Sequence, residues 1–117
     1  MLEENALRQF TSTTSYYRHW LSRFVYTDGV KYVADNGGAH WLLDAIASYQ
    51  PKLLKDPMLE EFQYWKLTVS ADQKATLVCE RDTDDVVVTQ NFSLTDFPLS
   101  EISFYLVTGV LMLPSEF

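Results

Sequence analysis

The second half of the chain alternates its side chains with a period of two, and this pattern constrains the fold more than any other feature. Between residues 63 and 71, one set of side chains is strongly apolar and the other is polar or mixed. The first set is Gln63, Trp65, Leu67, Val69 and Ala71, and the second is Tyr64, Lys66, Thr68 and Ser70. Such alternation is typical of a half-buried β-strand, because successive side chains of a strand point to opposite faces.

Polar turns divide the rest of this half into further strands. Residues 72–74 and 82–85 are turn-forming, so strands are expected over residues 75–81 and 86–92. A loop is expected over residues 94–100, and a hairpin turns at Thr108 and Gly109. The chain from Pro57 onward therefore predicts a β-meander.

The terminal hairpin, over residues 102–113, has two apolar faces. A two-residue turn places Phe104, Leu106, Leu111 and Leu113 on one face, and Tyr105, Val107, Val110 and Met112 on the other. A hairpin at a wet surface would carry one polar side. We expect helices of the chain to cover one face. Tyr105, Val107, Val110 and Met112 are the candidate interface of a homodimer.

The first half of the chain predicts helices. Thr27 is an N-cap for a helix that begins with Asp28 in its first turn and ends at residues 36–38, where two glycines stop it. Asp28 and Gly29 would alternatively form a tight hairpin turn, but the residues that follow are poor strand formers. A second helix is expected over residues 39–49, ended by Pro51.

The remaining N-terminal segments are shorter. A helix is expected over residues 2–10, a loop over residues 11–15 and a strand over residues 23–26, whereas residues 16–22 could be strand or loop. With 117 residues, the chain has the size of one domain. We expect a single α+β domain over residues 1–117, with N-terminal helices packed on a mostly antiparallel four- to five-stranded meander sheet.

Charge narrows the range of partners. Nine Lys and Arg residues face 16 Asp and Glu residues, which gives a net charge of −7. This balance argues against binding to nucleic acids or anionic membranes, because both require a surplus of positive charge. No apolar run approaches the roughly 20 residues that span a bilayer. The N-terminus lacks a secretory signal and Cys79 is the one cysteine, so a cytoplasmic location is expected.

Two residue pairs could support catalysis. His40 and Asp44 are spaced to share a helix face, where a carboxylate could tune a general base; the alternative is a solvated surface pair. His19 and Cys79 could form a nucleophile and its base; the alternative is a buried cysteine that acts as a small hydrophobe. We favour the second interpretation in both cases.

A third candidate site combines aromatic rings with positive charge. Tyr16, Tyr17, Arg18 and His19 resemble sites for single-stranded nucleic acid, in which rings stack on bases. The acidic net charge favours packing instead. The acidic turn at residues 82–85 lacks the pattern of a calcium loop, and no zinc spacing or phosphate-binding glycine motif occurs, so no cofactor or metal is expected.

Three short runs carry a resemblance to a known family. They are residues 26–32 (YTDGVKY), residues 41–47 (WLLDAIA) and residues 113–116 (LPSE). The chain resembles a family of small, uncharacterised bacterial proteins that is known as a domain of unknown function and is associated with cyanobacteria and with plasmid or phage-borne genes. The resemblance implies a compact α+β domain and brings no activity, cofactor or catalytic residue.

Together these features favour a non-enzymatic protein-interaction module that forms a homo-oligomer, most simply a dimer. One alternative is a small hydrolase-like enzyme that uses His40 and Asp44, or His19 and Cys79. Another is an acidic mimic of nucleic acid, or a host-interaction protein of a mobile element, because residues 82–117 contain six acids and no Lys or Arg.

Overall fold

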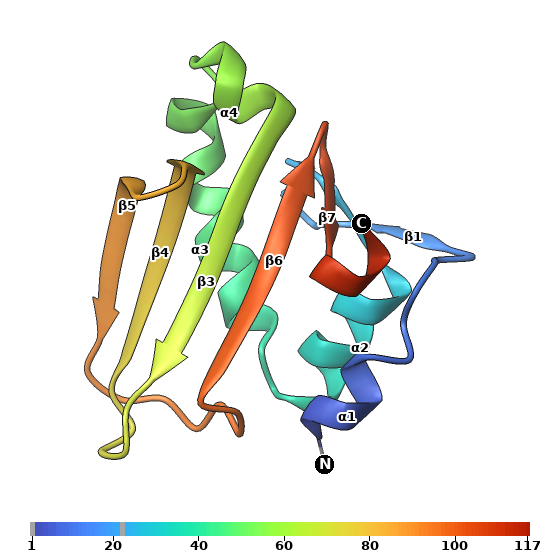
Figure 1. The fold of residues 1–117 in the computed structure, drawn as a ribbon, viewed down its shortest axis with the longest axis vertical. Helices are drawn as coiled ribbons and strands as arrows, with labels where there is room; N and C mark the ends of the chain where they lie inside the picture. The colour runs from blue at the N-terminus through green and yellow to red at the C-terminus, as the bar shows by residue number, and fades with distance from the viewer. Residues whose placement is uncertain (1, 22) are drawn as a thin grey trace.

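A seven-stranded sheet organises the part of the chain that the computed structural model describes, residues 2–21 and 23–117 (Figure 1). The strands are β1 (Tyr16–Arg18), β2 (Val25–Thr27), β3 (Phe62–Val69), β4 (Ala75–Asp82), β5 (Asp85–Phe92), β6 (Glu101–Val107) and β7 (Val110–Met112). Their order across the sheet is β1-β2-β7-β6-β3-β4-β5. Strands β2 and β7 run parallel, and the other neighbours run antiparallel.

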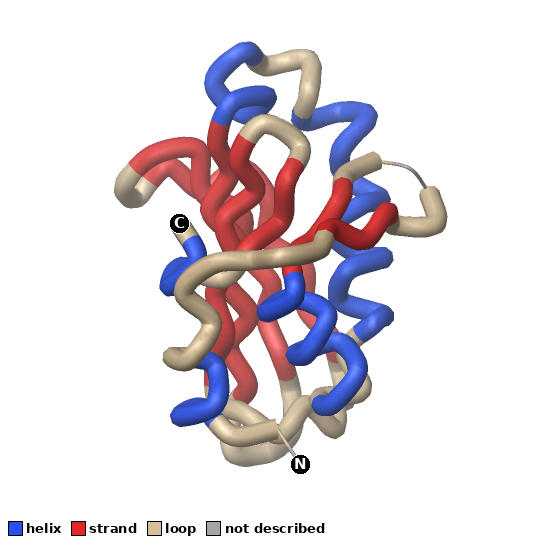
Figure 2. Tube along the Cα trace, turned by 90° about the vertical axis from the view of Figure 1, so that its right-hand side faces the viewer, coloured by secondary structure: helices blue, strands red, loops and turns tan. Residues whose placement is uncertain are grey.

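Two helices form a layer on one side of this sheet. The helices are α1 (Glu4–Leu7), α2 (Asp28–Asn36), α3 (His40–Leu53) and α4 (Pro57–Glu61), followed by the 3₁₀ turn η1 (Pro114–Glu116). The turned view shows α2 and α3 on one side of the strands and the C-terminus on the other (Figure 2). No helix within residues 2–21 and 23–117 is long and apolar enough to cross a membrane.

The fold expected from the sequence, helices on a four- to five-stranded antiparallel meander, is wrong. Two N-terminal strands extend the sheet, and β2 makes it mixed by running parallel to β7. The meander also breaks after β5, because the loop over residues 93–100 carries the chain past the ends of β4 and β3 (Figure 1). Strand β6 therefore pairs with β3 instead of β5.

Strand β1 contains three residues, too few for a period of two to be evident in the sequence, whereas β2 overlaps the strand expected over residues 23–26. Residues 16–18 of the undecided stretch 16–22 are strand, and Ser22 lies outside the described residues. The parallel pairing of Val25 with Val110 supplies β2 with a partner that the sequence pattern does not indicate.

The local predictions for α2 are confirmed. Helix α2 starts directly after Thr27, whose hydroxyl accepts a hydrogen bond from the Val30 amide. It ends before Gly37, and Gly38 takes a positive φ of 60°. The expected end of α3 at Pro51 is wrong, because the helix continues to Leu53. A proline removes one backbone hydrogen bond, and the buried Leu53 side chain holds this last turn against the core.

The sequence pattern also missed α4 but gave the correct register of the terminal hairpin. Asp56 caps α4 by accepting from the Met58 amide, and proline follows it at the first helical position. In the hairpin, Tyr105 lies opposite Met112 and Val107 opposite Val110, as expected. The turn residues Thr108 and Gly109 both have positive φ, which matches the twist of the two strands.

The core lies between α2, α3 and the sheet face toward them. Alternate residues of the central strands are buried there, which are Trp65, Leu67, Leu77, Cys79, Phe104 and Leu106. Val30, Val33, Leu42, Leu43 and Ile46 from the helices complete this layer. Since one face of each strand is used in this way, α2 and α3 leave the other face of the sheet without a helix layer, and the short 3₁₀ turn η1 lies over part of it (Figure 1).

Candidate functional site

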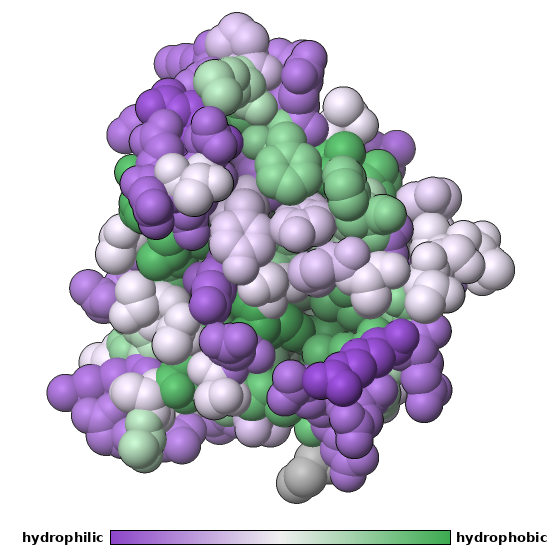
Figure 3. Space-filling model, in the orientation of Figure 1, coloured by the Kyte–Doolittle hydropathy of each residue, from purple (hydrophilic) through white to green (hydrophobic). Residues whose placement is uncertain are grey.

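The sheet face away from α2 and α3, here called the open face, carries partly exposed side chains from four neighbouring strands, β7, β6, β3 and β4. Its members are Phe62, Tyr64, Lys66, Val78, Glu80, Ser103, Tyr105, Val107, Val110 and Met112. The four residues predicted as an interface all lie on this face, and the alternate residues Leu106 and Leu111 point into the core. Figure 3 shows apolar and neutral side chains in the middle of the face, with hydrophilic ones at the upper left and along the bottom.

Four aromatic rings gather on the open face around Tyr105. The centroid of its ring lies 5.1 Å from Phe62, 5.7 Å from Tyr64 and 5.2 Å from Phe117. Phe117 is 72% exposed and reaches this cluster because η1 turns the end of the chain over the sheet. These distances are those of ring pairs that attract one another. We call Phe62, Tyr64, Tyr105 and Phe117 the aromatic cluster.

Strand register places an acidic side chain beside the aromatic cluster. Tyr64 on β3 lies opposite Glu80 on β4 and opposite Tyr105 on β6. Glu80, Tyr64 and Tyr105 therefore form one row across three strands, with neighbouring strands about 4.8 Å apart. The Tyr64 hydroxyl shares a hydrogen bond of 3.0 Å with Ser103, which fixes the direction of its ring.

A pocket of about 330 Å³ opens at the Glu80 end of this row. Its lining consists of Phe62, Tyr64, Tyr105, Glu80, Arg81, Asp82 and Thr83. The β4–β5 turn forms one wall, and three rings of the aromatic cluster, Phe62, Tyr64 and Tyr105, form the other. We call this site the aromatic–acidic pocket.

The one cation in the lining of this pocket is already paired. The Arg81 guanidinium donates to Asp56 at 2.7 Å and to Asp85 at 2.8 Å. The hydrogen bonds with Asp85 and Asp56 raise the pKa of Arg81, and the bond from Arg81 lowers the pKa of Asp56. Within the described part of the chain, neither Glu80 nor Asp82 is in an ion pair. The pocket therefore has an acidic character.

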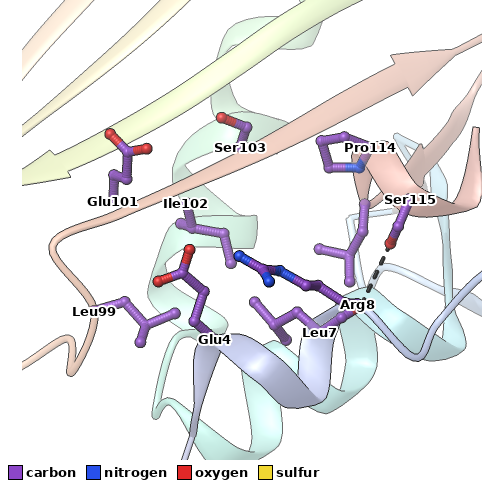
Figure 4. Close-up of a pocket in the computed structure, with 10 residues that line it drawn as sticks. Glu4, Leu7, Arg8, Leu99, Glu101, Ile102, Ser103, Pro114 and Ser115 are labelled. Atoms are coloured by element: carbon purple, nitrogen blue, oxygen red, sulfur yellow. Dashed lines mark hydrogen bonds between the residues drawn. The ribbon is translucent and has the colours of Figure 1, made fainter.

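A second pocket of about 290 Å³ lies between α1, β6 and η1 (Figure 4). Arg8 and Glu4 reach into it from α1, and Glu101 borders it from β6 (Figure 4). The Ser115 hydroxyl donates to the Leu7 carbonyl at 3.3 Å and ties η1 to α1. The pocket carries charges of both signs, and neither histidine nor cysteine is among its lining residues.

The predicted pairing of His40 with Asp44 does not form. His40 Nε2 lies 2.8 Å from Oδ1 of Asp35, at the end of α2. Asp44 instead has His19 Nε2 at 2.8 Å and accepts a hydrogen bond from Trp20 Nε1, also at 2.8 Å. The structure thus joins two residues that the sequence analysis considered separately.

The His19 ring is fully engaged in this arrangement. Its Nδ1 accepts a hydrogen bond from the Leu21 amide at 3.2 Å, and an amide can only donate. The ring proton is therefore on Nε2, which donates to Asp44. His19 is 3% exposed, so neither nitrogen is available to take a proton from a substrate. His19 therefore acts as a structural link, which joins the β1–β2 connection to α3 through Asp44.

Cys79 and His19 are not brought together. Cys79 lies on β4 opposite Trp65 and Val88, and its side chain is fully buried. His19 follows β1, five strands away in the sheet, which corresponds to roughly 24 Å along the sheet. Burial raises the pKa of the Cys79 thiol to about 12, so the nucleophilic thiolate is scarce at neutral pH.

The aromatic segment at residues 16–19 attaches to the rest of the chain. The Tyr17 ring stacks on Tyr26 at 5.7 Å, and its hydroxyl donates to Asp28 at 3.1 Å. Tyr16 and Arg18, on either side of it in β1, are exposed.

In the acidic turn, the Asp84 amide donates to Glu80 at 3.1 Å. The described residues include no group of His, Cys, Asp or Glu that could hold a metal ion.

Sequence reasoning missed Phe62, Tyr64, Glu80 and Phe117 as members of this site. Phe62 continues the set that contains Tyr64 and Lys66, so extending the alternation by one residue would have found it. Glu80 is placed beside Tyr64 by strand pairing, and Phe117 is placed by η1. No pattern in the sequence indicates that Glu80 or Phe117 belongs to this site.

Comparisons with curated proteins and with solved structures find no significant match. A comparison with family models finds one that covers residues 1–117 and is described as a family of unknown function, DUF6876. The resemblance seen in the three short runs is thereby confirmed at the level of an uncharacterised family. The chain belongs to the family of unknown function DUF6876.

Proposed function

We propose that this chain is a non-enzymatic protein-interaction module and that the open face is its docking surface. The observation that carries the proposal is the aromatic cluster, four rings gathered on the sheet face that α2 and α3 leave uncovered. Tyrosine and phenylalanine are enriched at protein interfaces, because a large rigid ring buries much apolar area at a low cost in conformational entropy. A bacterial cytoplasmic setting belongs to this proposal, supported by the single free thiol of Cys79.

A second copy of the chain is the first partner that we propose. Tyr105, Val107, Val110 and Met112 present an apolar strip at the β6–β7 side of the open face. A twofold contact would bring this strip against itself, as in an isologous dimer. The side chains of Val107, Val110 and Met112 form no strong hydrogen bonds with water. Burying them in an interface is therefore favourable.

Light scattering over a range of protein concentrations tests the dimer. We expect the dimer mass for the native chain and the monomer mass for Met112→Lys, which puts a charge in the middle of the strip. The matched control is Val86→Lys, since Val86 is 49% exposed on the edge strand β5 and away from the strip. A monomer mass of the native chain at every concentration would refute the dimer.

The two alternative functions have less support. The hydrolase alternative used His40 with Asp44 or His19 with Cys79, and neither pair is in contact: His40 is bonded to Asp35, and His19 is bonded to Asp44. A mimic of nucleic acid would present unpaired carboxylates, yet many acids bond to groups of the chain itself. Those acids are Asp28, Asp35, Asp56, Asp85, Glu101 and Glu116.

A further inference from the structure

The aromatic–acidic pocket combines two features that select the same kind of ligand. Its first feature is the set of rings from Phe62, Tyr64 and Tyr105, which line one wall. The face of an aromatic ring carries partial negative charge and attracts cations. Its second feature is the pair of carboxylates from Glu80 and Asp82 on the other wall. Both walls therefore favour a positively charged group between them.

The carboxylates of the pocket are not neutralised by a cation of the described chain. Arg81 is held by Asp56 and Asp85, whose oxygens lie 2.7 and 2.8 Å from its nitrogens, and is directed to these partners. Glu80 keeps one oxygen for the Asp84 amide, which is a neutral donor at the turn. A cation in the pocket would thus meet carboxylates that no lysine or arginine of the described chain neutralises. The net charge of −7 acts in the same direction at longer range.

We propose that the aromatic–acidic pocket binds the guanidinium group of an arginine side chain on a partner protein. This inference rests on the proposed function, since it names the chemistry by which the open face selects its partner. A guanidinium is planar and weakly hydrated, so it stacks on a tyrosine ring and donates in parallel to a carboxylate. A lysine ammonium is more strongly hydrated and lacks the planar fork.

The pocket size and the row geometry fit this ligand. A pocket of about 330 Å³ has the volume of a small-ligand site and is open to solvent on the sheet side. The Glu80–Tyr64–Tyr105 row places a carboxylate and two rings on successive strands, each about one strand spacing apart. A guanidinium over Tyr64 would therefore lie within reach of both Glu80 and Tyr105.

Titration of the full chain with capped arginine, N-acetyl-arginine amide, tests the proposal by amide NMR shifts. The matched control ligand is capped citrulline, which has nearly the same shape and no charge. We expect saturable shifts at Glu80, Asp82 and Tyr105 with a Kd on the order of 1–10 mM for capped arginine. We expect no saturable shifts with capped citrulline and weaker binding of capped lysine.

Two variants locate the site. Glu80→Gln keeps the acceptor for the Asp84 amide, and we expect it to weaken the binding of capped arginine roughly fivefold. Asp82→Asn provides an independent second variant with the same expected direction. The matched control is Glu101→Gln, at the far end of the open face, where Glu101 pairs with Lys66 and we expect no change in Kd.

The outcomes separate this proposal from the dimer. Equal shifts with arginine and citrulline, shifts that leave the pocket residues unaffected, or no shifts at all would overturn the arginine site. Equal binding by Glu80→Gln and the native chain would do the same. A monomeric chain that binds capped arginine at the pocket would refute the dimer and leave the arginine site supported.

Discussion

Replacement of Gln63 by leucine should strongly destabilise the fold, because Gln63 is the centre of a buried amide network. Gln63 and Gln50 are both fully buried between α3 and β3. The Gln63 carbonyl oxygen accepts from Gln50 at 3.0 Å and from Trp65 at 2.8 Å. The Gln63 amide nitrogen donates to Gln50 at 2.8 Å and to Leu59 at 3.0 Å. Since the indole of Trp65 can only donate, this pattern fixes the orientation of both amides.

The size of the loss follows from the groups left without partners. Leucine at position 63 leaves three buried side-chain groups unpaired, which are one N–H and the carbonyl oxygen of Gln50 and the indole N–H of Trp65. Each unpaired buried group costs about 1–3 kcal/mol, and the added apolar side chain returns about 1 kcal/mol. We expect the free energy of unfolding to fall by about 3 kcal/mol. A typical domain has about 5–15 kcal/mol in total.

A double replacement tests whether Gln50 and Gln63 are energetically coupled. Gln50→Leu removes the Gln50 donor, so the combination of Gln50→Leu with Gln63→Leu leaves the indole of Trp65 as the one unpaired donor among these three side chains. The double variant should therefore be more stable than Gln63→Leu alone. Independent sites would instead give costs that add.

Urea unfolding followed by circular dichroism measures these differences. The control is Gln9→Leu, at an exposed position, which should change the free energy of unfolding by less than about 0.5 kcal/mol. A loss below about 1 kcal/mol for Gln63→Leu, or a double variant whose cost equals the sum of the single costs, would refute the network argument.

Three further predictions concern the α2 terminus and the core. Gly29→Ala should lower stability by about 2 kcal/mol in the same urea assay, because its Cβ would lie 2.6 Å from Oε1 of Glu116 and displace this carboxylate from its hydrogen bonds with Thr27 and the Leu113 amide; unchanged stability would contradict this cause. The backbone hydrogen bond from Thr14 is the main cause that lowers the pKa of Asp28. The stabilisation by Asp28 is therefore complete above its unfolded pKa of about 3.9 and is lost as the pH falls through the lower folded pKa. In thermal melts from pH 6 to pH 2, Asp28→Asn should lose less stability than the native chain, and parallel curves would disprove the link. Burial raises the pKa of Cys79 to about 12, so a thiol reagent at pH 8 should react at the rate of unfolding, and fast labelling of the native chain would show an accessible thiol.

Several local features can be predicted from the sequence alone. Thr27 gives the start of α2, because a hydroxyl that satisfies a free amide is a property of a few neighbouring residues. The Thr108–Gly109 turn sets the register of the terminal hairpin, so the division between Tyr105 on one face and Leu106 on the other is already present in the sequence. Such features depend on periodicity and turn chemistry within a short window.

The tertiary structure alone decided which elements meet. The pairing of β6 with β3 depends on where the loop over residues 93–100 returns the chain, and the parallel contact of β2 with β7 joins residues 85 positions apart in the case of Val25 and Val110. The choice of Asp44 as the partner of His19 has the same origin. Alternation fixes the face on which a side chain lies and not the strand beside it, because a strand can form backbone hydrogen bonds with any other strand. The Glu80–Tyr64–Tyr105 row, and with it the aromatic–acidic pocket, exists because long-range packing of the core selected one order of strands.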